Sequence, residues 1–140
     1  MKKEQKKIFG YYLMLDIYDC DPGTMEDIRG CYKYLDGLAD ILGLERLSPP
    51  FVVCTDSKKY PDKAGLSGWI PFWNKKDNTF AGSSVHTLTP ANFISLDIFS
   101  CKKFDKEVII DFVKKTFKPR KIEEQYLSRG MVRHKGLLGY

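Results

Sequence analysis

The chain has 140 residues and a mass of 16.2 kDa, which suffices for one compact domain but not for two ordinary ones. Its 43% apolar and 29% charged residues are typical of a globular protein and exclude a disordered chain. No apolar stretch approaches the roughly 20 residues that cross a bilayer, and no apolar segment follows the basic start as in a secretory signal. We therefore expect a single cytoplasmic domain over residues 1–140, soluble and with no membrane partner.

The formal net charge of +5 comes from basic residues near the two ends of the chain. Four lysines lie within residues 2–7, and five lysines and arginines lie within 114–121. A nucleic-acid surface interleaves such residues with exposed aromatic rings, whereas here they fit solvated termini and a helix C-terminus. We expect no nucleic-acid partner, a basic N-terminal segment at 1–8 and a C-terminal tail at 129–140.

The cysteines are too scattered for a metal site or a disulfide scaffold. The four of them lie at positions 20, 31, 54 and 101, without a Cys-x-x-Cys pair, and only His86 and His134 accompany them. Structural zinc sites need ligands at short, regular spacings. We therefore expect reduced thiols and no metal.

The first predicted elements are a strand and a helix. Residues 11–18 are aromatic, β-branched and largely apolar, which predicts a mostly buried strand ended by the turn residues 21–23. Thr24, three residues before Asp27, resembles a capping box and predicts a helix start. Apolar residues then recur at steps of three and four up to Gly43. The expected inward face comprises Ile28, Cys31, Tyr32, Leu35, Leu38, Ala39 and Leu42.

The middle of the chain predicts a short strand and a hairpin. Residues 51–54 form the short strand, and 69–73 and 79–88 form the hairpin, with turn residues at 74–78. Pro71 cannot donate a hydrogen bond to a ladder. Its strand should therefore lie at a sheet edge or carry a bulge.

The last third of the chain predicts a strand, a helix and a weaker strand. Residues 92–99 alternate, with Phe93, Ser95, Asp97 and Phe99 on one face and Ile94, Leu96 and Ile98 on the other. Asp105 caps a helix that ends before Pro119, and 121–127 form the final strand. The expected inward residues of this helix are Val108, Ile109, Phe112, Val113 and Phe117. This order predicts an α+β two-layer sandwich, an antiparallel β-sheet with two helices on one face.

Three side chains are candidates for chemistry. Ser67 lies between glycines that would allow close approach of a ligand, His86 lies among small polar residues, and Cys101 follows the strand at 92–99. A Ser–His pair suits acid–base work and a Cys–His pair suits nucleophilic catalysis. Each also has a purely structural interpretation, as a turn serine, a hydrogen-bonded histidine and a buried thiol.

Four short motifs occur in an order that resembles the pyruvoyl-dependent S-adenosylmethionine decarboxylase family, in its short bacterial and archaeal form. They are Tyr18-Asp19-Cys20-Asp21, Gly65-Leu66-Ser67-Gly68, His86-Thr87 and Asp97-Ile98-Phe99-Ser100-Cys101. The resemblance covers most of the chain. It implies the family's fold, S-adenosylmethionine or a related small molecule as ligand, a lyase activity in polyamine (spermidine) synthesis, and a homodimer. It also implies that Ser67 and His86 assist self-cleavage and that Cys101 protonates the decarboxylated carbanion.

The serine that this family converts into its pyruvoyl group is missing. The family cuts its own chain in a Glu-Ser-His motif, and counting back five residues from His86 reaches Ala81, which has no hydroxyl to attack the preceding carbonyl. Phe80 and Gly82 replace the flanking glutamate and histidine. Counting forward from Ser67 reaches Lys75 instead, because the hairpin is about six residues longer than the family's usual spacing.

Three functions stay open from the sequence. The first is decarboxylation of S-adenosylmethionine or a related amino acid, with a pyruvoyl group formed at the displaced candidates Ser83 or Ser84. The second is an uncleaved binding or regulatory module that keeps the nucleoside pocket. The third is an uncleaved enzyme that uses Cys101 and His86 directly. We expect an uncut chain, and an elongated groove in which Cys101 lies closer to Ala81 than to His86.

Overall fold

The computed structural model describes residues 8–55 and 58–130, and every structural statement below concerns this part of the chain. One sheet contains all its strands, in the order β2-β4-β5-β6-β1-β7, and β3 pairs with β4. Every pairing is antiparallel. The strands are β1 (Gly10–Tyr18), β2 (Glu45–Arg46), β3 (Phe51–Thr55), β4 (Gly65–Asn74), β5 (Thr79–Leu88), β6 (Phe93–Ser100) and β7 (Lys121–Arg129).

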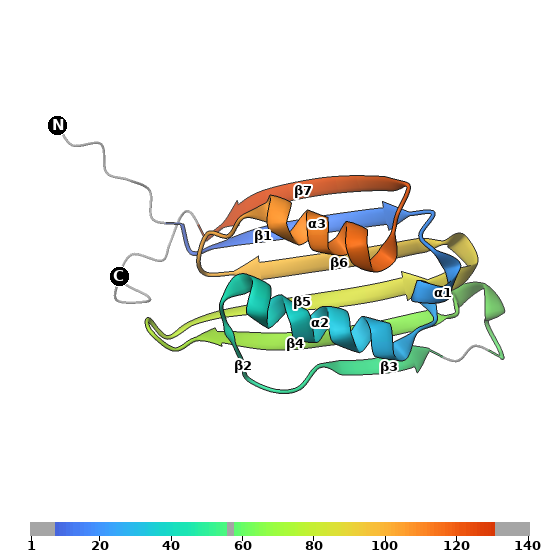
Figure 1. Ribbon diagram of the computed structural model, residues 1–140, viewed down its shortest axis with the longest axis horizontal. Coiled ribbons are helices and arrows are strands. Elements are labelled where there is room, and N and C mark those ends of the chain that lie inside the picture. Colours follow the sequence, from blue (N-terminus) through green and yellow to red (C-terminus); the bar gives the residue numbers. More distant parts are fainter. Residues whose placement is uncertain (1–7, 56–57, 131–140) are drawn as a thin grey trace.

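Two helices cover one face of this sheet (Figure 1). They are α2 (Ile28–Leu42) and α3 (Lys106–Phe117), and the single turns α1 (Pro22–Met25), η1 (Pro61–Lys63) and η2 (Thr89–Ala91) lie in the connections. The expected α+β two-layer sandwich is therefore confirmed. No helix of the described chain is long and apolar enough to span a membrane.

Strand alternation separates a core face from an uncovered face. In β1 and β6 every second residue is buried against the helices, and in β6 these are Ile94, Leu96 and Ile98, as the sequence predicted. The residues between them, including Asp97, point to the other face and stay partly exposed. The sheet thus has one face filled by helices and one face without a protein layer over it.

The helix α2 begins later than the sequence predicted. Asp21 caps α1 and Asp27 precedes α2, so Thr24 is not a helix cap, and its hydroxyl donates to the Asp21 carbonyl instead. Gly43 ends α2 in the left-handed conformation that glycine tolerates (φ 65°). Glu26 and Asp27 therefore separate the short turn α1 from the long helix α2.

Three residues assigned inward positions in the helices are in fact exposed. Ile28 and Tyr32 of α2 and Val108 of α3 retain 46%, 40% and 45% of their accessible surface. Tyr34, absent from the predicted inward face of α2, is fully buried and packs against Phe117 with ring centroids 5.1 Å apart. The expected helix faces were therefore rotated slightly from the true contact surface.

The strand β4 explains how the sheet tolerates Pro71. Its outer edge pairs with β3 up to Trp69 and with β2 from Phe72, so Pro71 falls in the gap between the two short strands. There it needs no donor, and its carbonyl accepts a hydrogen bond from Leu47 (3.1 Å). The expectation of a sheet-edge strand or a bulge is therefore wrong: β4 lies inside the sheet, and Pro71 is tolerated because neither β2 nor β3 pairs with it.

The ends of the chain were only partly predictable. β7 runs to Arg129, two residues further than expected, and pairs with β1 along its whole length. The expected basic segment at 1–8 and tail at 129–140 lie mostly outside the described residues.

Candidate functional site

Ser67 and His86 face each other across the β4–β5 ladder. They are register partners, and the His86 Nδ1 lies 3.0 Å from the Ser67 Oγ, within hydrogen-bond distance. Both side chains lie on the uncovered face, where His86 is exposed. An imidazole in this position can take or return the proton of the serine hydroxyl. The pair is therefore a possible acid–base unit.

The glycines beside Ser67 have packing roles. A Cβ at Gly65 would lie 1.7 Å from the carbonyl oxygen of Thr87, and one at Gly68 would lie 2.9 Å from the Leu35 side chain. Any larger residue at Gly65 would therefore push β4 away from β5. The motif keeps Ser67 at the correct height in the ladder, and close approach to a ligand is not needed to explain its glycines.

Cys101 lies at the opposite end of the sheet from the Ser67–His86 pair. His86 pairs with Ser95, whereas the Cys101 N–H donates to the Phe80 carbonyl (3.1 Å) one residue beyond the end of β6. Cys101 lies six residues beyond Ser95, the register partner of His86, which corresponds to about 20 Å along a strand. One copy of the chain thus brings Ser67 and His86 together but leaves Cys101 beside Phe80.

A hydrogen-bonded carboxylate occupies the middle of the uncovered face. The Tyr12 hydroxyl and the Ser84 N–H donate to the two oxygens of Asp97, at 2.7 and 2.9 Å. Burial and this bond to Asp97 raise the pKa of Tyr12 to about 12. Tyr12 therefore stays protonated at neutral pH. Sequence reasoning missed this contact, although the alternation of both strands places the two residues on one face.

The region expected to hold the cleavage serine is regular strand. Ala81, 9% exposed, pairs with Phe72 on one side and Ser100 on the other. Ser83 is 4% exposed and donates to the Asp97 carbonyl (2.6 Å), and Ser84 continues the same ladder. None of these positions lies in a turn.

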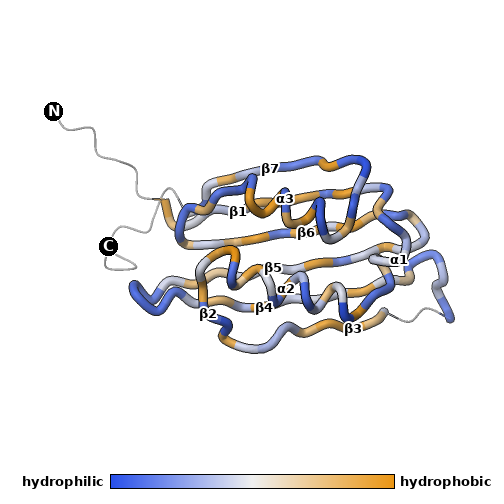
Figure 2. Tube along the Cα trace, in the orientation of Figure 1, coloured by the Kyte–Doolittle hydropathy of each residue, from blue (hydrophilic) through white to orange (hydrophobic). Residues whose placement is uncertain are grey.

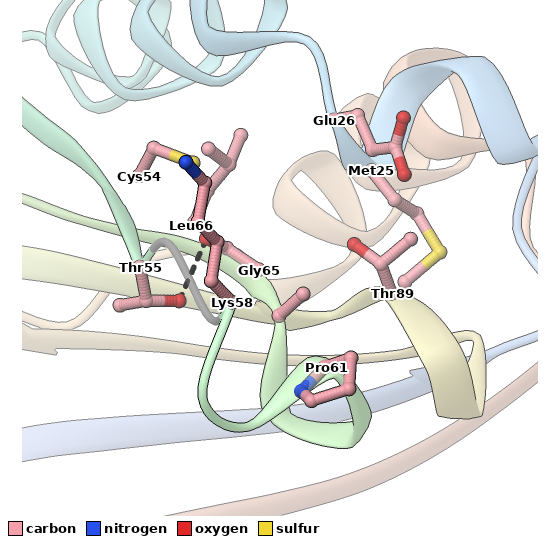
Figure 3. A pocket seen from close by; sticks show the side chains of 10 residues that line it. Met25, Glu26, Cys54, Thr55, Lys58, Pro61, Gly65, Leu66 and Thr89 are labelled. Carbon is pink, nitrogen blue, oxygen red and sulfur yellow. Dashed lines mark hydrogen bonds between the residues drawn. The ribbon is translucent and has the colours of Figure 1, made fainter.

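A cavity of about 470 Å³ opens beside the start of β4 (Figure 3). Its volume falls within the 300–1,000 Å³ typical of small-molecule sites. Leu66 lines it and faces the helices, so the cavity and the adjacent Ser67 lie on different faces of the sheet. The lining residues are Met25, Glu26, Cys54, Thr55, Lys58, Pro61, Ala64, Gly65, Leu66 and Thr89.

Thr87 connects two of the residues that line this cavity, Met25 and Leu66. The Thr87 hydroxyl donates to the Met25 carbonyl (3.1 Å) and accepts from the Leu66 N–H (2.8 Å). Both bonds are buried and connect the turn α1 to β4 and β5. These bonds fix the segments on either side of the cavity relative to each other. The lining residues come from several segments of the chain, so the sequence alone did not predict the cavity.

The cysteines differ in their surroundings. Burial raises the pKa of Cys20 and of Cys31 to about 11, so both remain neutral thiols. Cys54 is exposed and Cys101 is half-buried. Within residues 8–55 and 58–130, no three His, Cys, Asp or Glu side chains are placed to hold a metal ion.

Comparison with known proteins identifies the group of proteins to which this fold belongs. The crystal structure of the adenosylmethionine decarboxylase from Aquifex aeolicus is similar with a TM-score of 0.72 and 19% identity, and the match covers 91% of this chain and 96% of that one. This similarity concerns the fold.

Sequence comparison then specifies the family. S-adenosylmethionine decarboxylase proenzymes are 26% identical over 127 residues in Clostridium botulinum, covering 90% of this chain and 98% of the relative, and 23% identical over 128 residues in Persephonella marina, covering 91% and 86%. The family model for S-adenosylmethionine decarboxylase matches residues 11–130. The chain therefore belongs to the S-adenosylmethionine decarboxylase family.

Proposed function

We propose that this protein is an uncleaved member of its family, which binds S-adenosylmethionine or a related nucleoside without forming a pyruvoyl group. Ala81 carries this proposal, because a methyl group stands where self-cleavage needs a hydroxyl. The residues at this position do not fit the pyruvoyl group. The ligand and the link to polyamine synthesis come from family membership, and the loss of the parent reaction comes from Ala81.

Cleavage at a displaced serine is the alternative, and it has less support. The Ser83 hydroxyl is buried and already donates to the Asp97 carbonyl. Ser84 is paired with Trp69 on one side and Asp97 on the other. Neither backbone has the exposure or the turn that would let it rearrange.

The retained Ser67–His86 pair favours a surviving ligand site. The pair is accessible, and its two side chains can exchange hydrogen bonds with the hydroxyl and amino groups of a nucleoside. The cavity that begins at Leu66 offers a second, more apolar surface at the same end of the sheet. Direct chemistry by Cys101 and His86 within one copy is disfavoured by their separation of about 20 Å.

We further propose a homodimer that forms through the uncovered sheet face. Four large apolar side chains on this face remain about half exposed, and a second copy would cover them. A two-fold axis between the two sheets and across their strands would place the Cys101 end of each copy against the Ser67–His86 pair of its partner. The four side chains are Phe51, Trp69, Phe80 and Leu127.

Intact mass spectrometry and calorimetry test the central proposal. We expect a single species at 16.2 kDa, heat of binding with S-adenosylmethionine, and no release of CO2. His86→Ala should weaken binding about fivefold or more, the effect of losing one or two hydrogen bonds of about 1 kcal/mol. His86→Asn, which can still bond to Ser67, should lose less.

Two results would contradict the proposal. Stoichiometric fragments that sum to the chain mass, one of them with a pyruvoyl-blocked terminus, would restore the parent reaction. A folded, uncut protein that gives no heat of binding with S-adenosylmethionine would contradict the proposed ligand.

A further inference from the structure

We infer that the register of the β4–β5 hairpin, and not only the missing hydroxyl, prevents self-cleavage, so that serine restored at position 81 stays inert. This inference rests on the proposed function, because it explains why the chain remains uncut. It goes beyond that proposal, which concerns the side chain of one residue. Here the barrier is a property of the backbone.

The peptide bond in question lies inside a continuous ladder. The β4–β5 pairing runs from Ser67 and His86 to Asn74 and Thr79 with no skipped residue. Ala81 is the third pair from the hairpin tip, and on its other side it pairs with β6. The bond between residues 80 and 81 is therefore held between two neighbouring strands.

This setting opposes the first step of cleavage. A serine Oγ would have to add to the carbonyl carbon of residue 80, which moves the carbonyl oxygen out of the peptide plane. The Cys101 N–H donates to the Phe80 oxygen (3.1 Å), which holds this carbonyl in the ladder direction beside the end of β6. Positive φ angles, which mark a turned backbone, occur nearest at Asn78 (φ 55°) and not at position 81.

The acid–base pair does not add to this barrier, because the family's cleavage serine also lies five residues before its histidine. His86 lies five residues further along β5 than position 81, a separation of about 17 Å. The side chain at position 81 points to the helix side and is 9% exposed, whereas His86 lies on the uncovered face. Within one copy a serine hydroxyl at position 81 would meet neither Ser67 nor His86, on the long or the shortened hairpin, so their help would come from the partner copy of the proposed dimer.

The extended hairpin is a folded element rather than a loose insertion. The Trp73 indole N–H donates to the Asn78 side chain (2.9 Å), and the Thr79 hydroxyl donates to Asp77 (2.6 Å). Asp77 also forms an ion pair with Lys102, which lowers the pKa of its carboxyl. The tip is hydrophilic (Figure 2). These contacts fix the turn at the tip, so that position 81 stays in the third residue pair of the ladder counted from the turn.

Shortening the hairpin should move the turn to the required place. Deleting residues 73–78 joins Phe72 to Thr79 and removes the two outermost residue pairs of the ladder, so the last pair becomes Phe72 with residue 81. Residues 72 and 79–81 then form a four-residue turn that ends at position 81. The hairpin is about six residues longer than the family's usual spacing, which matches the length of this deletion.

Three variants test the inference by intact mass and denaturing gel. The first, Phe80→Glu with Ala81→Ser and Gly82→His, restores the motif on the long hairpin and should stay uncut. The second adds the deletion of 73–78 and should give two fragments that sum to its mass. The third carries the deletion with Phe80→Glu and Gly82→His but keeps Ala81, and it should stay uncut. Circular dichroism and a thermal melt verify that each variant is folded.

The outcomes separate this inference from the proposed function. Cleavage of the first variant overturns the inference while leaving the proposed function intact, because the natural chain still lacks the hydroxyl. A folded second variant that remains uncut also overturns it, since register would then not be the barrier. If deletion variants fail to fold, the first variant alone decides, by remaining whole or by being cut.

Discussion

Asp97 is the residue around which the uncovered face is organised. Its carboxylate accepts from the Tyr12 hydroxyl and the Ser84 N–H, and its backbone carbonyl accepts from the Ser83 hydroxyl. These three donors come from β1 and β5, the two strands that flank β6. A single side chain thus links three neighbouring strands at the middle of the sheet and fixes their relative register.

The Tyr12–Asp97 bond predicts a measurable titration. The pKa of Tyr12 is raised to about 12, first by burial and then by its bond to Asp97, whereas a tyrosine in an unfolded chain titrates near about 10. Because the folded value is the higher one, this stabilising contribution is complete below about pH 10 and is lost between about pH 10 and 12. The phenolate absorbance of the wild type minus that of Tyr12→Phe should therefore rise near pH 12.

The matched variant for this titration is Asp97→Asn. It removes the negative charge but keeps an acceptor for the tyrosine hydroxyl, so the Tyr12 titration should move toward pH 10. A difference signal that already titrates near pH 10 in the wild type would show that the hydroxyl is not held by Asp97 in solution.

At the scale of elements, helix burial gives a stability prediction for α2. Leu35 is fully buried beneath Gly68 of β4, whereas Ile28 at the start of the helix is 46% exposed. Leu35→Ala should lower the free energy of unfolding by about 2–5 kcal/mol, the cost of a cavity in a packed core. Ile28→Ala should cost less than about 1 kcal/mol.

Urea unfolding monitored by tryptophan fluorescence measures both variants. The two changes remove aliphatic side chains of equal atom number from one helix, so the difference between them isolates burial. Equal losses of stability would mean that α2 contacts the sheet through Ile28 as well, as its sequence pattern alone had indicated.

Strand faces were easier to predict than helix faces, for a physical reason. A strand has only two faces, so the alternation in 93–99 assigned the apolar residues to the core face without ambiguity. The structure confirms this assignment. A helix turns about 100° per residue, and its apolar stripe is wider than the contact with the sheet. Ile28 and Tyr32 belong to the stripe but lie at its exposed margin, while the aromatic ring of Tyr34 was overlooked.

The site was less predictable than the fold because it depends on register. The sequence identified Ser67, His86 and Cys101 as candidates but gave no pairing between β4 and β5. That pairing places Ser67 opposite His86 and leaves Cys101 about 20 Å away. The cavity beside Leu66 depends on four separate segments, none of which has a distinctive local pattern.

At the scale of the whole molecule, the two faces of the sheet differ in how far they are buried. The helices bury one face in the core. On the other face, the rings of Phe51 and Trp69 are in contact, with centroids 4.6 Å apart and planes tilted by 37°, and both remain about half exposed. Such a surface is costly to leave in water unless a partner covers it. The same face carries the Ser67–His86 pair, so a partner there would also enclose the candidate site.

Trp69→Glu tests the dimer that this face predicts. Light scattering of the wild type should give twice the chain mass of 16.2 kDa, and a buried carboxylate at position 69 should shift the protein to monomers, because an unpaired charge in an interface is strongly unfavourable. Val108→Glu is the matched control: Val108 is exposed to the same degree, 45% against 46%, but lies on α3. It should leave the dimer unchanged. A wild type that is monomeric at micromolar concentration, or a Val108→Glu variant that dissociates while Trp69→Glu does not, would contradict a dimer through the sheet.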